Sequence, residues 1–204
     1  DKTRRIGDLL PCLRSIEIRT QDDDTRRTEI RQVLPYLTLP SLNYASLRNL
    51  EDIWGTDKDV HGVKLFLKTL DVAFLNSEGD TSTCRILRCC PNIEHLSYSS
   101  TGKFRDGEED VESEGLIAQL SESVPQLKSL AIGDADFEHM AGDTAVPVFE
   151  REENDDDPFL EQLTSLDIQC NHIWSRHWHD RSIWPLFPPT LQNLTVRYVY
   201  FDAL

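Results

Sequence analysis

Residues 125–132 read PQLKSLAI, and residues 163–168 repeat the same pattern as LTSLDI. Each stretch has one apolar residue, a second apolar residue three positions later, and a third two positions after that. The last three positions alternate between apolar and outward-facing side chains, which is typical of a strand with one buried face. We therefore predict a strand at each copy of the pattern, starting at its first apolar residue.

The pattern occurs seven times, at intervals of 25 to 36 residues. The first apolar residues of the copies are Leu13, Leu42, Leu67, Ile93, Leu127, Leu163 and Leu191. Recurrence at such intervals indicates a solenoid, in which one supersecondary unit stacks on the next and the array folds as one body. We therefore predict a single domain of about seven irregular repeats over residues 1–204. Because the sequence starts at Asp1 without Met, we expect it to be part of a longer chain.

The segments between the copies predict a turn and a helix in each unit. A proline precedes the first apolar residue in five copies: Pro11, Pro40, Pro91, Pro125 and Pro189. Apolar residues that share a helical face occur in residues 24–34 (Ile30, Val33, Leu34), 81–90 (Ile86, Leu87, Cys90) and 110–124 (Leu116, Ile117, Leu120, Val124). The unit is predicted to be helix, proline turn and strand, which makes an α/β fold with parallel inner strands and outer helices.

Two stretches resemble a known family. Residues 90–96, CPNIEHL, look like the C-P-x-L-x-x-L opening of the cysteine-containing leucine-rich repeat, and residues 163–171, LTSLDIQCN, match L-x-x-L-x-L-x-C-N. The chain resembles leucine-rich-repeat proteins, most closely the divergent repeats of fungal F-box proteins, from about Leu9 to Val199. Only Asn171 occupies the family's asparagine position, so the resemblance implies a leucine-rich-repeat solenoid in the form of an irregular arc.

The resemblance also implies a function in protein–protein interaction. It points to the substrate-recognition repeat domain of an F-box-like ubiquitin ligase receptor, which holds a protein target while an upstream F-box docks to the ligase adaptor. No F-box is visible in residues 1–204, so this expectation places one before Asp1. The alternatives are a stand-alone leucine-rich-repeat scaffold with no ubiquitin role and a metal-binding protein or enzyme.

The outward positions of the seven copies predict the binding face. The first ladder is Glu17, Ser46, Asp71, Ser97, Ala131, Asp167 and Thr195, and the second is Arg19, Arg48, Ala73, Ser99, Gly133, Gln169 and Arg197. Small residues fill the middle, and arginines stand near both ends. We predict a face that accepts a protein segment, with Asp71, Asp167 and Gln169 on it. The candidate anchors for partner carboxylates are Arg19, Arg48 and Arg197. The alternative is an ordinary hydrated surface.

The charge of the chain restricts its partners. Its 36 acidic and 21 basic residues give a formal net charge of −15, which argues against nucleic acid as the direct partner. Acidic residues cluster in residues 22–24, 106–114 and 150–157. These runs are predicted to be solvated loops, with an acidic rim that steers a basic partner as the alternative.

The five cysteines are Cys12, Cys84, Cys89, Cys90 and Cys170. An odd count without regular disulfide spacing is typical of a reducing compartment, so we expect an intracellular protein, cytoplasmic or nuclear. Cys84 and Cys90 are predicted to be small core residues. The sequence contains no signal-like apolar run and no stretch long enough to span a membrane, and we expect no membrane partner.

The segment 172–189 is rich in His and Trp. Cys170, His172, His177 and His179 could ligate zinc, but their spacing matches no zinc finger, so we predict no metal and no cofactor. A loop folded over its own aromatic side chains is favoured, and Trp174 and Trp178 are candidates for a binding hot spot. The chain contains no Gly-x-Ser-x-Gly elbow, Walker loop or dinucleotide fingerprint, and we predict that it is not an enzyme.

Overall fold

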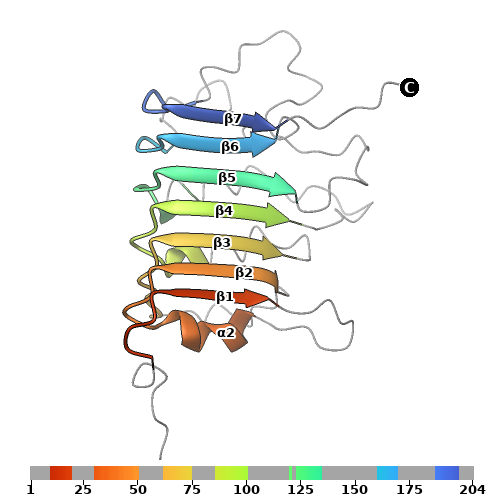
Figure 1. Ribbon diagram of the computed structural model, residues 1–204. Helices are drawn as coiled ribbons and strands as arrows, with labels where there is room; N and C mark the ends of the chain where they lie inside the picture. Colours follow the sequence, from red (N-terminus) through yellow and green to blue (C-terminus); the bar gives the residue numbers. More distant parts are fainter. Residues whose placement is uncertain are drawn as a thin grey trace, which may run out of the picture.

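The computed structural model describes residues 10–19, 30–50, 62–74, 86–100, 120, 123–134, 160–169 and 187–197. These residues form one open sheet of seven parallel strands, which lie side by side in chain order (Figure 1). The strands are β1 (Ser15–Arg19), β2 (Tyr44–Leu50), β3 (Thr69–Phe74), β4 (His95–Ser100), β5 (Ser129–Asp134), β6 (Ser165–Gln169) and β7 (Asn193–Arg197). The predicted parallel sheet is confirmed.

The register between the strands follows the phase of the sequence pattern. The second apolar positions pair across the whole sheet in the row Ile16, Ala45, Leu70, Leu96, Leu130, Leu166 and Leu194. The third apolar positions form the next row, Ile18, Leu47, Val72, Tyr98, Ile132, Ile168 and Val196. Both rows point to the same face of the sheet, and this face packs against the core. The side chains between them point to the opposite face, which is called the outward face below.

The strands begin two residues later than predicted, because the first apolar residue closes a turn. The N–H of Leu127 donates to the carbonyl oxygen of Val124 at 3.0 Å, and the strand starts only at Ser129. In the described part of the chain this bond recurs at Leu13, Leu42, Ile93, Leu127, Leu163 and Leu191. Five of these six turns have proline at their second position, where its fixed φ favours a turn.

The third copy enters its strand in a different way. Among the described residues no turn bond of this kind is seen at Leu67; instead the N–H of Leu65 donates to the carbonyl oxygen of Cys89 at 2.7 Å. Leu65 and Leu67 are both fully buried. This repeat therefore keeps the apolar pattern, but the segment before its strand is hydrogen-bonded to Cys89 of the next repeat.

The core lies between the inward strand rows and the segments that connect the strands. Helix α2 (Ile30–Leu37) buries Val33, Leu34 and Leu37 against the sheet. It extends past the predicted end at Leu34, because Leu37 continues the buried stripe, and it contains Pro35. The residues of the other two predicted helices that the structure describes are buried as expected: Ile86, Leu87, Cys90, Leu120 and Val124. None of the described helices is long and apolar enough to cross a membrane.

Candidate protein-interaction face

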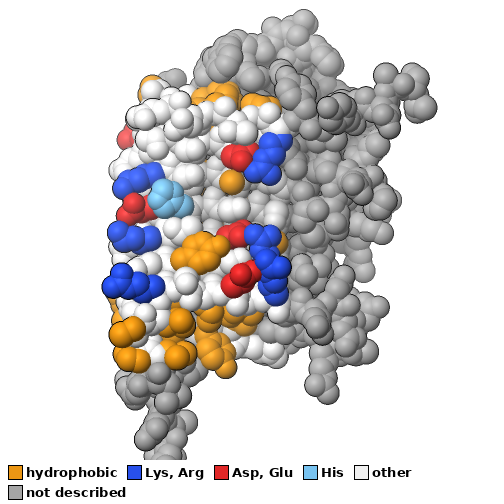
Figure 2. All heavy atoms as spheres, viewed as in Figure 1, with side chains coloured by type: hydrophobic (Ala, Val, Ile, Leu, Met, Phe, Trp, Pro, Cys, Tyr) orange, Lys and Arg blue, Asp and Glu red, His pale blue; other side chains and the backbone are white. Residues whose placement is uncertain are grey.

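The outward face of the sheet carries the two predicted ladders as rows in register. Strand pairing joins the first ladder from Glu17 to Thr195 without a break. It also joins Arg19, Arg48, Ala73, Ser99 and Gly133 of the second ladder, and Gln169 with Arg197. Figure 2 shows this face uncovered, with acidic and basic side chains in contact near the carboxyl ends of the strands.

One charged group on this face joins β2 to β3. The Nη2 atom of Arg48 donates to Oδ2 of Asp71, and its Nε donates to the Ser46 hydroxyl at 3.3 Å. That hydroxyl in turn donates to Asp71 Oδ2 at 3.2 Å. Ser46 is only 2% exposed although it faces outward, because both charged groups bond to it. The three residues form a preorganised polar cluster.

A second pair joins β6 to β7. Arg197 Nη2 lies 2.5 Å from Asp167 Oδ2, and this hydrogen bond raises the pKa of Arg197 above its ordinary value. The other carboxylate oxygen, Asp167 Oδ1, is buried, and no hydrogen-bond partner for it is seen in the described part of the chain. On β1 a third pair, Arg19 and Glu17, is more exposed, with 67% and 51% of the two side chains accessible.

The three arginines predicted as anchors therefore lie on the outward face, and each already binds a carboxylate of this chain. A partner carboxylate would have to compete with a neighbour that is already in place. Gln169 lies opposite Arg197 in the register, but its side chain is outside the described residues. Trp174 and Trp178 also lie outside the described residues, so their role stays a prediction.

Small residues occupy the outward face between the two cross-strand pairs. Strands β4 and β5 present Ser97 and Ser99 beside Ala131 and Gly133. The first ladder thus reads, across four strands, aspartate, serine, alanine and aspartate, with Asp71 at one end and Asp167 at the other. Two carboxylates flank a floor of small side chains.

The sequence ladders omitted a third outward row at the start of the strands. Tyr44 on β2 and His95 on β4 belong to it, and Tyr44 is 38% exposed. Exposed tyrosines are common in protein interfaces, because the ring offers a large contact area and a hydroxyl. These residues lie two positions before the first ladder, so extending the alternation of each strand toward its amino end would have predicted this row.

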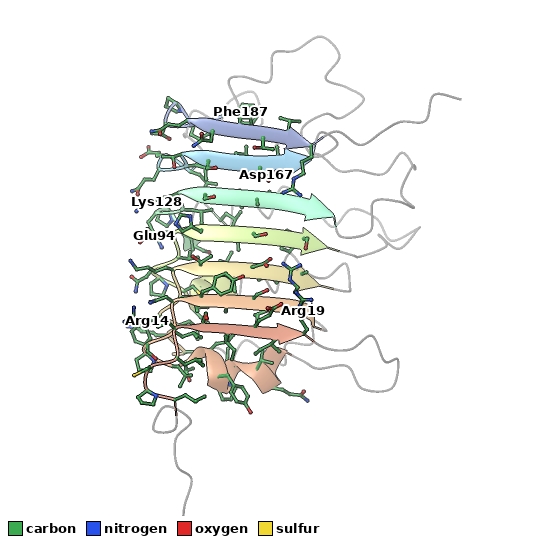
Figure 3. All side chains as sticks on the ribbon, viewed as in Figure 1. Arg14, Arg19, Glu94, Lys128, Asp167 and Phe187 are labelled. Carbon is green, nitrogen blue, oxygen red and sulfur yellow. The ribbon has the colours of Figure 1, made fainter. Side chains whose placement is uncertain are left out.

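A row of charged residues precedes the strands and was also missed. Glu94 lies 2.8 Å from Lys128 and 3.4 Å from Lys68, one repeat away on either side (Figure 3). The hydrogen bond and charge of Lys128, followed by those of Lys68, lower the pKa of Glu94. All three residues directly follow the first apolar position of their copies, so an alignment of the repeats would have placed them together.

The described residues contain no cluster of side chains suited to bind a metal ion. Among them there is no group of three or more His, Cys, Asp or Glu side chains that could hold a metal ion. The residues weighed as possible zinc ligands, Cys170, His172, His177 and His179, lie outside the described part of the chain, as do Cys84 and the three acidic runs. Cys90 is fully buried in the core, as predicted, and burial raises the pKa of its thiol.

Comparison of the chain with known proteins found no similar protein. No protein-family model matches the chain, and neither a curated protein nor a solved structure matches it. The resemblance to leucine-rich repeats therefore rests on the sequence motifs.

Proposed function

We propose that the chain is a leucine-rich-repeat interaction module that holds a protein segment on the outward face of its sheet. The observation that supports the proposal most strongly is that one face of this parallel sheet is not apolar. All-parallel sheets are usually covered on both sides, and their strands are then continuously apolar. Here the strands alternate: β5 reads SLAIGD, with Leu130 and Ile132 buried and Ala131 and Gly133 facing outward.

The regular pairing supports the solenoid part of the proposal. Each strand pairs with its neighbours in chain order, and a similar turn precedes most strands in the described residues. Such an array presents a broad surface built from many repeats, which is how repeat proteins bind extended segments of other proteins. The exposed Tyr44 adds an aromatic contact to this surface.

A substitution in the centre of the face tests this proposal. Ala131→Arg would place a long side chain over the floor of small residues without changing a core position. We expect the variant to keep its circular dichroism spectrum and to bind the partner at least about tenfold more weakly, since a bulky charge in the centre of an interface costs well over 1.4 kcal/mol. The control is Gln162→Arg, which adds the same side chain to the exposed turn that precedes β6. Equal binding by the two variants would overturn the proposal.

The role in ubiquitin ligation rests on the family resemblance. We propose that the module is the substrate-recognition domain of an F-box-like receptor. The test is to purify the full-length gene product and probe it for the ubiquitin-ligase adaptor. Recovery of the adaptor would support a substrate receptor; a clean failure with folded protein would leave the stand-alone repeat scaffold.

A further inference from the structure

Strand β1 forms one edge of the sheet, and in the described part of the chain only β2 pairs with it. Its inward residues Ile16 and Ile18 are only partly buried. Their row partners on β2, Ala45 and Leu47, are fully buried. Figure 2 shows hydrophobic side chains gathered at this end of the molecule, where Leu10, in the turn before β1, is 44% exposed. An edge strand with accessible apolar side chains is a template for pairing with another strand.

The hydrogen bonds to β2 show which backbone groups of β1 point to its free edge. The carbonyl oxygen of Arg14 accepts a hydrogen bond from the N–H of Tyr44 at 3.1 Å, so it points toward β2. The N–H and C=O groups of one residue lie on the same side of an extended strand, and successive residues alternate between the two sides. The backbone groups of Ser15, Glu17 and Arg19 therefore point to the free edge.

The outward side chains of β1 are charged and complementary to themselves. Glu17 and Arg19 share one face, and 51% and 67% of their side chains are accessible, so a second molecule can reach both. Consider two β1 strands paired antiparallel about a two-fold axis at Ile18. Glu17 of each copy then lies directly opposite Arg19 of the other, and both residues direct their backbone groups to the shared edge. Each facing pair exchanges two backbone hydrogen bonds, and opposite charges across antiparallel strands are favourable.

Other two-fold registers of β1 lack this match. The inward side chains must stay on one face of the joined sheet, which places the axis at a residue of the strand. An axis at Glu17 brings two carboxylates together, and an axis at Arg19 brings two guanidinium groups together; like charges directly opposite each other are destabilising. An axis at Ile16 places Glu17 opposite Ser15, without a charge pair. Only the axis at Ile18 pairs both charges.

The opposite edge of the sheet does not offer the same complementarity. The outward residues of β7 are Asn193, Thr195 and Arg197, a set without a carboxylate. Stacking of β7 on β1 of a second copy, with the rows of the sheet continued, would place Arg197 beside Arg19. This contact between like charges disfavours an open chain of copies joined head to tail.

We propose that two copies of the chain pair through β1, antiparallel and with Ile18 on the two-fold axis. A two-fold interface uses the same surface on both copies, so the assembly closes as a dimer. The inward rows continue from one copy into the other, which gives Ile18 an apolar neighbour at the edge. The outward faces lie on the same side of the joined sheet, so the dimer leaves both uncovered.

Sedimentation velocity of the purified chain over a range of concentrations tests the proposal. We expect the wild type to show an equilibrium between monomer and dimer. Arg19→Glu surrounds the axis with four carboxylates and should raise the dissociation constant at least about tenfold, because two favourable pairs become repulsive. The double variant Glu17→Arg, Arg19→Glu keeps the net charge and restores opposite charges in the same register, so its dissociation constant should lie within about twofold of the wild-type value.

The control is Arg88→Glu, which makes the same change of charge at an exposed position outside β1 and should leave the dimer unchanged. Circular dichroism verifies that each variant is folded. A wild type that stays monomeric, or a dimer that Arg19→Glu leaves intact, would overturn the proposal. Failure of the double variant to restore the dimer would overturn the register, and equal weakening by Arg88→Glu would reduce the effect to net charge. Particles that keep growing with concentration would indicate head-to-tail stacking and overturn the closed dimer.

Discussion

Arg48 on β2 reaches diagonally to Asp71 on β3. The register places Arg48 opposite Ala73 and Asp71 opposite Ser46, yet the guanidinium binds the aspartate two residues away. Arg197 makes the corresponding diagonal to Asp167 from the opposite side, since its register partner is Gln169. Diagonal neighbours on one face of a sheet lie within reach of long side chains. Each diagonal thus joins two consecutive repeats.

The Arg48–Asp71 pair should stabilise the fold measurably. A double-mutant cycle with Arg48→Ala and Asp71→Ala should give a favourable coupling of about 0.5–1 kcal/mol in urea unfolding. The reason is that the Asp71 side chain is only 16% exposed, so water screens the pair incompletely. The same cycle on Arg19 and Glu17 serves as the control, and we expect a coupling near zero at that exposed site. Equal couplings would show that burial does not decide the strength of the pair.

Core positions of one row should differ in their contribution to stability. Leu70 on β3 is fully buried, whereas Leu194, in the same row on β7, is only partly buried. We expect Leu70→Ala to lower the free energy of unfolding by about 3 kcal/mol, and Leu194→Ala to lower it by about 1 kcal/mol. Urea titrations followed by circular dichroism measure both values. A larger loss at Leu194 would contradict a core centred on the middle strands.

Glu94 should make stability depend on pH in the acid range. The two lysines lower its folded pKa below the ordinary 4.5, so its contribution is full above that value and is lost as the pH falls through the lower folded value. Wild type should therefore be more stable than Glu94→Gln at pH 6, and the difference should shrink as the pH falls below 4.5. Urea unfolding across this range is the measurement. Glu161→Gln removes an exposed turn carboxylate as the control; a gap for Glu94→Gln that did not change with pH would contradict the ionic origin.

The buried thiol of Cys90 should resist alkylation in the folded protein. Burial, with a further contribution from Cys89, raises the pKa of Cys90, so little reactive thiolate forms. Cys12 is exposed. With iodoacetamide at pH 8, mass spectrometry of proteolytic peptides should find Cys12 modified in the native protein and Cys90 modified only after unfolding in urea. Equally fast modification of both in the native protein would contradict the buried position.

The sequence predicted the rows of the sheet because hydrophobic spacing records which side chains face the core. Ile16, Leu70 and Leu130 occupy the same place in three copies, and the structure pairs their strands in that phase. The turns were indicated by their prolines, since Pro91 and Pro125 restrict φ to values that a turn requires. Burial and local backbone preference are properties of short segments, and they can be read without the partner strand.

The strand starts and the ion pairs could not be predicted in the same way. An apolar residue such as Leu127 is buried whether it lies in a strand or closes a turn, so its spacing did not reveal that Ser129 begins the strand. The pairing of Arg197 with Asp167 depends on side-chain conformation across two strands, and no periodicity encodes it. The alternation of the strands predicted that these residues share one face, but only the structure shows that the arginines already bind carboxylates.

Main-chain hydrogen bonds join consecutive repeats just before the strands begin. The carbonyl oxygen of Glu94 accepts hydrogen bonds from the N–H groups of both Lys128 and Ser129, and the carbonyl oxygens of Lys68 and Lys128 do the same for the repeats that follow them. Because these bonds need no particular side chain, a repeat can lengthen or change its composition and still form the same hydrogen bonds to the repeat before it. Under tension applied across the strands, these junctions are loaded in series, so the weakest one would open first and the described repeats would separate one after another.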